Sequence, residues 1–295
     1  MDVNVLRKPK IDSGKRIRII QRIFGYSALT LIALFAMAPL LWLFDISFRP
    51  KVEIFNIPPA ILTKGFFGSF ASYSLDSFIK SIVRFNVHIG FLNSAFIVVC
   101  GIFFTLLVGS LASFAFAFLK FPGRNVLFIA VLATMMLPTG TMLAPFYQVL
   151  RMLGLTNNLF GIIIPYAAGA WTVFMIRQYF VRLPYSFVEA GIVDGAGFYR
   201  VWWQIILPLA KPALAAMAIL QFRGIWNDFL LPMIVLRDDI YHTLPIKLQV
   251  MNSMNYDIPY DAMMATSFIT ALIPVIFFLI FQRYFVEGIA GGMKG

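Results

Sequence analysis

Five stretches of this 295-residue chain contain no Asp, Glu, Lys or Arg, and each is long enough to cross a bilayer as a helix. A spanning helix needs about 20 mainly apolar residues to bridge a hydrocarbon layer about 30 Å thick. Such stretches fold as helices because backbone amides and carbonyls cannot be left unpaired in lipid. The sequence therefore predicts an all-α integral membrane protein. The charge-free stretches are 23–44, 85–119, 125–150, 152–176 and 262–282.

A sixth segment, 208–236, is apolar except for three charged residues and brings the expected number of transmembrane helices to six. The first apolar run is long and has no small-residue cleavage site. We therefore expect it to remain as a span rather than to be removed as a signal peptide. The expected organisation is a basic cytoplasmic tail at 1–22, followed by one transmembrane domain at 23–295.

The basic residues are distributed unevenly between the two faces that six spans would define. Fifteen Lys and Arg fall on the side of both termini and of the loops at 120–124 and 182–207, and eight fall on the other side. Cytoplasmic loops carry the excess of Lys and Arg. The sequence therefore predicts cytoplasmic termini, and an external connection at 46–84. We interpret the net charge of +11 as this topology signal and as attraction to membrane lipid, not to nucleic acid.

Few residues of the chain could bind a metal or act as catalysts. The one cysteine, Cys100, lies in the second span, and the two histidines, His88 and His242, are far apart in the sequence. One Cys and two distant His cannot build a metal cluster. The sequence contains no G-x-x-x-x-G-K-[ST] phosphate loop and no evident nucleophile–base pair. We therefore expect no catalytic residue, no metal site and no cofactor site in this chain.

A polar stretch with two acids and three glycines interrupts the apolar sequence between the fourth and fifth expected spans. Ser186 and Glu189 have the spacing of a capping box, in which the Ser caps a helix and the Glu reaches back. Glycine is favoured just past a helix end, so a short helix is expected from Ser186 to about Gly195. Gly197 then permits a turn, and a second helix is expected from Phe198 onwards.

This stretch resembles the EAA loop of ABC-importer permeases, in which Glu-Ala-Ala, two residues and Asp-Gly-Ala precede an aromatic residue, an Ile and two prolines. Here Gly191 replaces the usual second Ala, and Trp202 stands where the family often has Phe. The resemblance implies that the loop at about 184–208 is a cytoplasmic elbow that docks into a groove on an ATPase subunit. The alternative is a simple connecting loop. The residues assigned to coupling are Ser186, Glu189, Ala190, Gly191, Asp194, Gly195, Ala196 and Gly197.

Three other segments resemble the carbohydrate-uptake branch of the same family. They are the opening of the external connection at 47–55, the Trp-Asn-Asp-Phe-Leu sequence at 226–230, and the ending at 281–295, which resembles that of the maltose-type second permease. In that family the C-terminal tail reaches the ATPase. The resemblance therefore implies a contact through the tail at 288–295, with Gly292 and Lys294. The alternative is a glycine-rich terminus that touches nothing.

Residues that are unusual inside a membrane span are the candidates for a transport path. The third span contains two prolines and a glycine, which predict a kinked or unwound helix that either serves packing or forms a wall of the path. The fifth span carries polar and ionisable residues, which either face water or bond to one another at membrane depth. Both interpretations stay open. The candidates are Met136, Thr139, Trp171, Gln221, Arg223 and Asn227.

The resemblance implies a permease of the bacterial inner membrane that pairs with a second homologous permease. Two ABC ATPase subunits would bind ATP and Mg²⁺, and an extracytoplasmic solute-binding protein would deliver a saccharide. An oligosaccharide, glycerol phosphate and an acidic saccharide all remain open. Two other classes are an ion-coupled carrier and a non-transporting scaffold. Such carriers usually place carboxylates at the membrane midplane and often show inverted repeats, whereas Asp228 is the only acid well inside a span.

Overall fold

The computed structural model describes residues 13–56, 72–254 and 258–292, and in these residues every element of regular structure is a helix. The expected all-α class is confirmed. The elements are α1 (Ser13–Ser47), α2 (Lys51–Ile54), α4 (Asp76–Phe85), α5 (Val87–Phe118), α6 (Arg124–Thr134), α7 (Thr139–Met152), α8 (Phe160–Ala167), α9 (Ala170–Phe180), α10 (Ser186–Val193), α11 (Phe198–Val201), a π-helical stretch (Trp202–Ile206), α12 (Leu207–Leu209), α13 (Lys211–Trp226), α14 (Leu230–Val235), a 3-10 turn (Asp239–Tyr241), α15 (Leu244–Asn252) and α16 (Tyr260–Gly292).

Helix α5 is the centre of the bundle, with α8, α9 and α13 packed around it and α16 packed against α13. Small residues allow these close approaches. A Cβ atom added at Gly101 would lie 2.9 Å from Cδ1 of Ile225 on α13, and one at Gly109 would lie 2.8 Å from Cγ2 of Thr172 on α9. Glycines at helix contacts let backbones approach closely in lipid. Helix α5 is thus fixed in place by backbone proximity as well as by side-chain packing.

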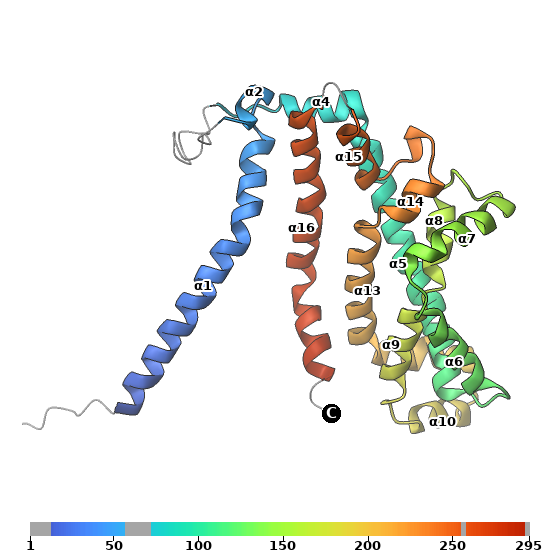
Figure 1. Cartoon of the computed structure of the whole chain (residues 1–295). Coiled ribbons are helices and arrows are strands. Elements are labelled where there is room, and N and C mark those ends of the chain that lie inside the picture. The colour runs from blue at the N-terminus through green and yellow to red at the C-terminus, as the bar shows by residue number, and fades with distance from the viewer. Residues whose placement is uncertain (1–12, 57–71, 255–257, 293–295) are drawn as a thin grey trace, which may run out of the picture.

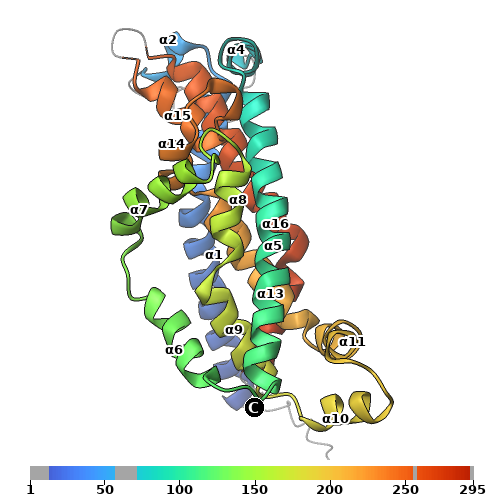
Figure 2. The same ribbon diagram turned by 90° about the vertical axis from the view of Figure 1, so that its right-hand side faces the viewer.

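The bundle has two ends, each with its own apolar core. We call the end that carries α2, α4 and α15 the outer end, and the end that carries α10 and α11 the inner end (Figures 1 and 2). The outer core gathers buried side chains of α5, α8, α14, α15 and α16. The inner core gathers those of α5, α9, α10 and the helical stretch at 198–209. The elbow therefore rests on a core of its own.

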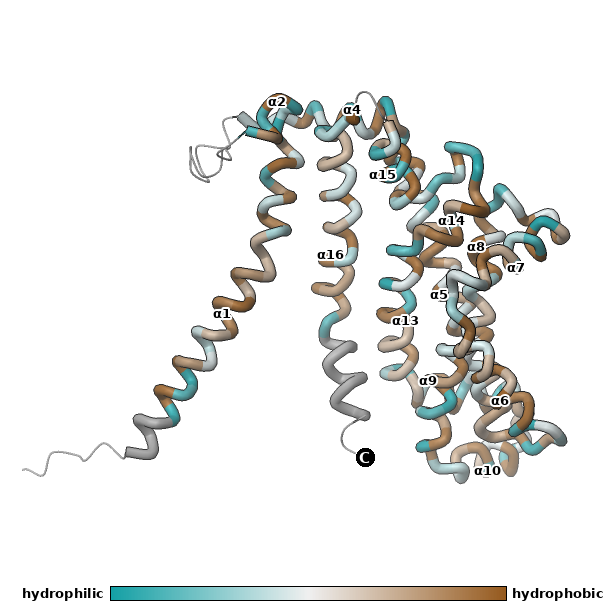
Figure 3. Tube along the Cα trace, viewed as in Figure 1, coloured by the Kyte–Doolittle hydropathy of each residue, from teal (hydrophilic) through white to brown (hydrophobic). Residues whose placement is uncertain are grey.

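Helix α1 meets the bundle near the outer end and diverges from it towards the N-terminus (Figure 1). At the outer end, Phe44 and Phe48 pack on Phe268 of α16. The most apolar part of α1 has no residue buried inside the chain. Apolar residues run along most of α1 and α16 (Figure 3). Helix α1 therefore presents an apolar surface that lipid or another subunit must cover.

Four helical segments are long and apolar enough to cross a membrane. Two bent helix pairs also pass this test if each pair is counted as one span, so the number of spans is four to six. The four segments are Arg18–Ser47, Val87–Phe118, Phe160–Phe180 and Tyr260–Gln282. The first, second and sixth expected spans thus have helical counterparts close to their expected bounds.

The third expected span is bent, as its prolines and glycine predict. Helices α6 and α7 meet at 106°. Pro138, at the break, has an extended backbone and lacks the N–H that a continuous helix would need there. The fourth expected span, 152–176, is displaced along the chain and begins at Phe160. Helix α7 continues to Met152, and the chain then turns through Gly154 and Asn157, which both have a positive φ.

The fifth expected span, 208–236, is not one helix. A bend of 80° separates α12 from α13, and α13 ends at Trp226. A carboxylate oxygen of Asp228 then accepts a hydrogen bond from the N–H of Leu230, the first residue of α14, at 3.1 Å. The expected continuous helix was wrong because Pro212 favours a helix start, and because α13 ends before Asp228 and a new helix begins at Leu230.

Candidate coupling elbow and transport path

Backbone carbonyls, not side chains, hold the beginning of the elbow helix α10. The N–H of Phe187 donates to the carbonyl of Pro184, and those of Val188 and Glu189 donate to the carbonyl of Tyr185, at 2.9–3.2 Å. No side chain caps this helix, and Ser186 is its first residue rather than its cap. The expected capping box was therefore wrong, because the preceding turn already satisfies the amides that a Ser cap would bond.

The end of α10 is a Schellman motif, and it requires a glycine. Gly195 has φ +82°. Its N–H donates to the carbonyl of Ile192, and the N–H of Ala196 donates to the carbonyl of Gly191, each at 2.9 Å. The helix end expected at Gly195 is confirmed. Gly197 has an ordinary φ of −68°, so the turn expected there is made by Gly195 instead.

The inner side of the elbow is packed tightly on the bundle. Val188, Trp202 and Ile206 are buried among side chains of α5 and α9. A Cβ atom added at Gly191 would lie 2.8 Å from Cδ1 of Ile205 and 2.9 Å from Cγ2 of Val201. Glycine replaces the family's usual alanine here because larger side chains of the second elbow helix occupy that space.

The other side of the elbow is open and largely apolar. Figure 2 shows α10 and α11 at the extremity of the inner end, away from the bundle axis. Among the assigned coupling residues, all but Gly191 and Ala196 are exposed; Gly191 is buried, and Ala196 packs against the inner core. Exposed apolar side chains gathered on one element mark a protein or membrane contact. Those of the elbow, each 41–85% exposed, are Phe187, Ile192, Val193, Phe198 and Tyr199. Trp203 is also exposed, but it lines a hollow with Phe103 and Leu106 of α5.

Helix α13 carries one exposed polar face that contains two of the path candidates. Arg223 and Asn227 lie one turn apart, and Nδ2 of Asn227 donates to the carbonyl of Arg223 at 2.9 Å. Among the residues that the structure describes, none forms an ion pair or a side-chain hydrogen bond with the guanidinium of Arg223. Asp228 bonds instead to the hydroxyl of Tyr166 on α8. The polar face of α13 is thus not completed by the described part of the chain.

The other path candidates are dispersed. Nε2 of Gln221 donates to Oγ1 of Thr172 at 2.6 Å, so Gln221 joins α13 to α9 as a structural bond. Met136 and Thr139 are exposed at the break between α6 and α7, and Trp171 is exposed on α9. Met136 lines an open apolar hollow of about 410 Å³ that includes Phe174. No hydrogen bond or ion pair between described residues joins these three to Arg223.

The C-terminal prediction is only partly within the described residues. Helix α16 extends to Gly292, and Lys294 lies outside the described residues. The expected ATPase contact of this tail therefore stays a prediction. Within the described residues, His, Cys, Asp and Glu side chains form no group of three that could hold a metal ion.

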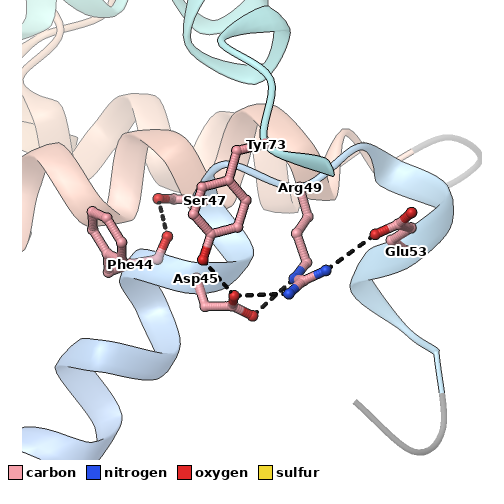
Figure 4. A network of polar contacts seen from close by, with 6 residues as sticks. All are labelled: Phe44, Asp45, Ser47, Arg49, Glu53 and Tyr73. Carbon is pink, nitrogen blue, oxygen red and sulfur yellow. Dashed lines mark hydrogen bonds and ion pairs between the residues drawn. The ribbon is translucent and has the colours of Figure 1, made fainter. Parts of the chain in front are cut away.

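A network of buried charges at the outer end was missed by the sequence analysis. The carboxylate of Asp45 forms two hydrogen bonds of 2.8 Å with the guanidinium of Arg49, and each side chain is about 2% exposed. Arg49 also bonds Glu53 at 3.0 Å, and the hydroxyl of Tyr73 donates to Asp45 at 2.7 Å (Figure 4). Burial and the bond to Asp45 raise the pKa of Tyr73 to about 12. The signal for this network in the sequence was the four-residue spacing of Asp45, Arg49 and Glu53, which places their side chains next to one another on a helix.

A second ion pair joins α15 to the 3-10 turn. Nζ of Lys247 lies 2.7 Å from a carboxylate oxygen of Asp239, and the Lys247 side chain is 2% exposed. Burial acts to raise the pKa of Asp239. The hydrogen bond and charge of Lys247, with smaller help from Asn86 and His242, outweigh it and hold that pKa below its ordinary value.

Comparison with known proteins places the chain in a family. Residues 101–291 match the family described as binding-protein-dependent transport system inner membrane component, and the chain belongs to this family. It is similar to the arabinooligosaccharides transport system permease protein AraQ of Halalkalibacterium halodurans, with 36% identity over 90% of this chain and 93% of the relative. It is also similar to the diacetylchitobiose uptake system permease protein NgcG of Streptomyces coelicolor, with 31% identity over 91% and 87% of the two chains.

A solved structure shares the fold. It is a chain of a bacterial ABC transporter involved in the import of the acidic polysaccharide alginate, with a TM-score of 0.78 and 24% sequence identity. The match covers 94% of this chain and all of the other. The chain is thus a multi-pass membrane component of a binding-protein-dependent transport system, with the fold of an importer permease.

Proposed function

We propose that this chain is one of two permeases that together form the path for ATP-driven uptake of a saccharide by an ABC importer. The observation that carries the proposal is the elbow, which is rigidly held on its inner side and apolar and open on the other. The family supports the transport role. The names of the two relatives, one for arabinooligosaccharides and one for diacetylchitobiose, favour an oligosaccharide as the substrate.

The open surfaces of the chain support a second permease as a partner. Helix α1 is uncovered, and an apolar groove of about 530 Å³ lies between α5, α13 and α16, where Ala215 and Ala218 leave room for another helix. The polar face with Arg223 and Asn227 is also uncovered. We assign Arg223 and Asn227 to the path, because an arginine at membrane depth needs water or a partner, and no described residue is such a partner.

The energy source would come from two ABC ATPase subunits, which bind ATP and Mg²⁺, because the chain has no phosphate loop. The elbow docks into a groove on one ATPase, and the C-terminal tail makes a further contact. ATP binding draws the two ATPases together and moves the elbow, so the permease pair opens to the solute-binding protein outside. Hydrolysis returns the pair to the inward-facing state. In this scheme both termini lie in the cytoplasm and the protein resides in the bacterial inner membrane.

A purified complex tests the proposal. The chain would be tagged and isolated from membranes, and the ATPase activity of the co-purifying subunits would be measured with the solute-binding protein and a panel of saccharides. We expect ATPase subunits to co-purify, and one oligosaccharide class to stimulate hydrolysis. An isolated chain that binds ATP by itself would contradict the assignment as a permease without ATPase activity. A complex whose ATP hydrolysis no saccharide stimulates would contradict the assignment of a saccharide as the substrate.

A further inference from the structure

Helix α4 lies across the outer end of the bundle instead of along it (Figure 1). Four large apolar side chains at its start and along its length are exposed: Leu75, Ile79, Ile82 and Val83, at 44–75%. On a helix with about 3.6 residues per turn, these positions fall on one side. An apolar side of this size on a short helix needs a cover, and the described part of the chain does not provide it.

The other two sides of α4 have different neighbours. Ser77, Ser81 and Phe85 are buried against the bundle. Asp76, Lys80 and Arg84 follow one another at four-residue spacing and form a charged side. The helix therefore has one side on protein, one charged side and one open apolar side. A helix in a membrane interface has this three-way division when it also leans on a protein.

Two contacts with α16 show which way these sides face. Nζ of Lys80 lies 2.9 Å from Asp261, in the first turn of α16. The ring of Phe78 lies edge-on to that of Phe268, with 6.4 Å between the centroids. Phe268 is seven residues further along α16, or about 10 Å deeper at 1.5 Å per residue. The charge-free run of α16 begins at Ala262, directly after Asp261, so Phe78 lies on the side of that apolar run and Lys80 lies on the side of its charged end.

The exposed apolar residues share the membrane side with Phe78. Leu75 and Ile82 lie three and four residues from Phe78, so they belong to the same stripe of the helix. Ile79 and Val83 widen this stripe away from the bundle. Lys80 shares its side with Asp76 and Arg84, which lie four residues before and after it. The apolar side therefore points towards the lipid, and the charged side points away from it.

We infer that α4 is an interfacial helix that inserts Leu75, Ile79, Ile82 and Val83 into the lipid leaflet at the outer end. Arg84 lies on the charged side and lines a hollow with Asp239 and Lys247. Only Asn86 separates α4 from α5, and its φ of 51° makes the sharp turn between them. The lipid contact thus fixes the depth of α5, the helix on which the rest of the bundle packs. This inference holds whatever substrate the protein carries.

Depth-dependent quenching tests the inference. Ile82→Cys would be introduced with Cys100→Ser and labelled with an environment-sensitive fluorophore, and Asp76→Cys would serve as the matched control on the charged side. The full chain, with the subunits that co-purify with it, would be placed in nanodiscs of phosphatidylethanolamine and phosphatidylglycerol with or without brominated acyl chains. Ile79→Cys provides a second apolar position if labelling at 82 disturbs the protein.

We expect brominated lipid to quench the label at position 82 by about twofold or more and to leave the label at position 76 nearly unchanged. Equal quenching at the two positions would overturn the inference. A blue-shifted label at 82 and at 79 that brominated lipid does not quench would also overturn it, because a protein subunit would then cover the apolar side. Labels at positions 79 and 82 that both emit like a water-exposed dye would also overturn the inference, because neither lipid nor protein would then cover the apolar side.

Discussion

The outer and inner ends of the bundle use their charges in opposite ways. At the outer end, charged side chains find partners within the chain, and one pair is almost completely buried. At the inner end, Glu189 and Asp194 are exposed beside apolar side chains, and neither forms an ion pair with a described residue. The outer pairs include Asp45 with Arg49, Lys80 with Asp261 and Lys247 with Asp239.

This difference indicates at which end the charged side chains are satisfied within the described part of the chain. At the outer end, ion pairs join the end of α1 to α2, α4 to α16, and α15 to the 3-10 turn. The elbow at the inner end is equally well fixed on its own core, but it presents apolar side chains and unpaired acids outwards. A rigid element with an unsatisfied outer side is suited to bind another protein and to transmit its movement.

The largest expected effect on stability lies at the outer end. Asp45→Asn leaves the buried guanidinium of Arg49 with only part of its partners, and we expect a loss on the order of 3 kcal/mol. Thermal unfolding of the purified protein in detergent measures this loss. The double variant Asp45→Leu with Arg49→Leu should recover much of it, because no buried charge remains. A single variant as stable as the original chain would show that the outer network does not hold α1.

The largest expected effect on partner binding lies at the inner end. Gly195→Asp places a side chain at a positive φ, which costs on the order of 1 kcal/mol, and into the open side of the elbow. We expect normal insertion and elution of the protein, and about a tenfold or greater drop in co-purified ATPase, as for a central interface residue. Gly140→Ala on α7, outside the elbow, is the control and should change nothing, because its φ is not positive and no atom lies within 4 Å of the added Cβ. Equal results for the two variants would refute the docking surface.

A smaller effect is expected for the acid of the elbow. Glu189→Ala removes one exposed charge, and we expect coupling of ATP hydrolysis to substrate to weaken by about 1 kcal/mol, or several-fold. Ser186→Ala should leave helix stability unchanged, because Ser186 caps nothing in this structure. A loss of stability in Ser186→Ala, seen by thermal unfolding, would restore the capping box that the sequence suggested.

The smallest effect is expected for the exposed partner of Lys247. The pKa of Asp239 is lowered in the folded protein, so the stability from its charge is present above its ordinary pKa of 3.8 and is lost as the pH falls below that value. Asp239→Asn should therefore lower the Tm by an amount that is constant from about pH 5 to 8 and shrinks below about pH 4. The carboxylate is more than half exposed, so the part of the difference that varies with pH should correspond to about 1 kcal/mol or less. If the Tm difference between the variant and the original chain changed between pH 6 and 8, a group other than Asp239 would be responsible.

Local rules predicted the helices and the end of the elbow well. Charge-free runs located α5 and α16, because lipid leaves a long apolar segment no other fold. Gly195 marked the end of α10, because a Schellman motif needs a residue that tolerates positive φ. These features depend on residues that lie close together in the sequence.

Features that depend on distant residues were not accessible from the sequence. The buried state of Asp45 and Arg49 requires Tyr73 and α16 to close over them. The start of α8 depends on turns at Gly154 and Asn157, which composition did not reveal. Ser186 matched a capping pattern, but the carbonyls of the preceding turn had already satisfied the amides. The lack of a charged partner for Arg223 among the described residues depends on how α8 packs against α13, because Asp228 bonds to Tyr166 on α8.

Uptake by a reconstituted complex tests the proposed function most directly. The chain, with its co-purified subunits and the solute-binding protein, would be placed in proteoliposomes and supplied with the labelled saccharide that best stimulates ATP hydrolysis. We expect accumulation that requires ATP on the side of the elbow, persists when ionophores collapse all ion gradients, and is lost in Gly195→Asp. Accumulation that needs no ATP and stops when an ion gradient collapses would contradict the account and would identify an ion-coupled carrier.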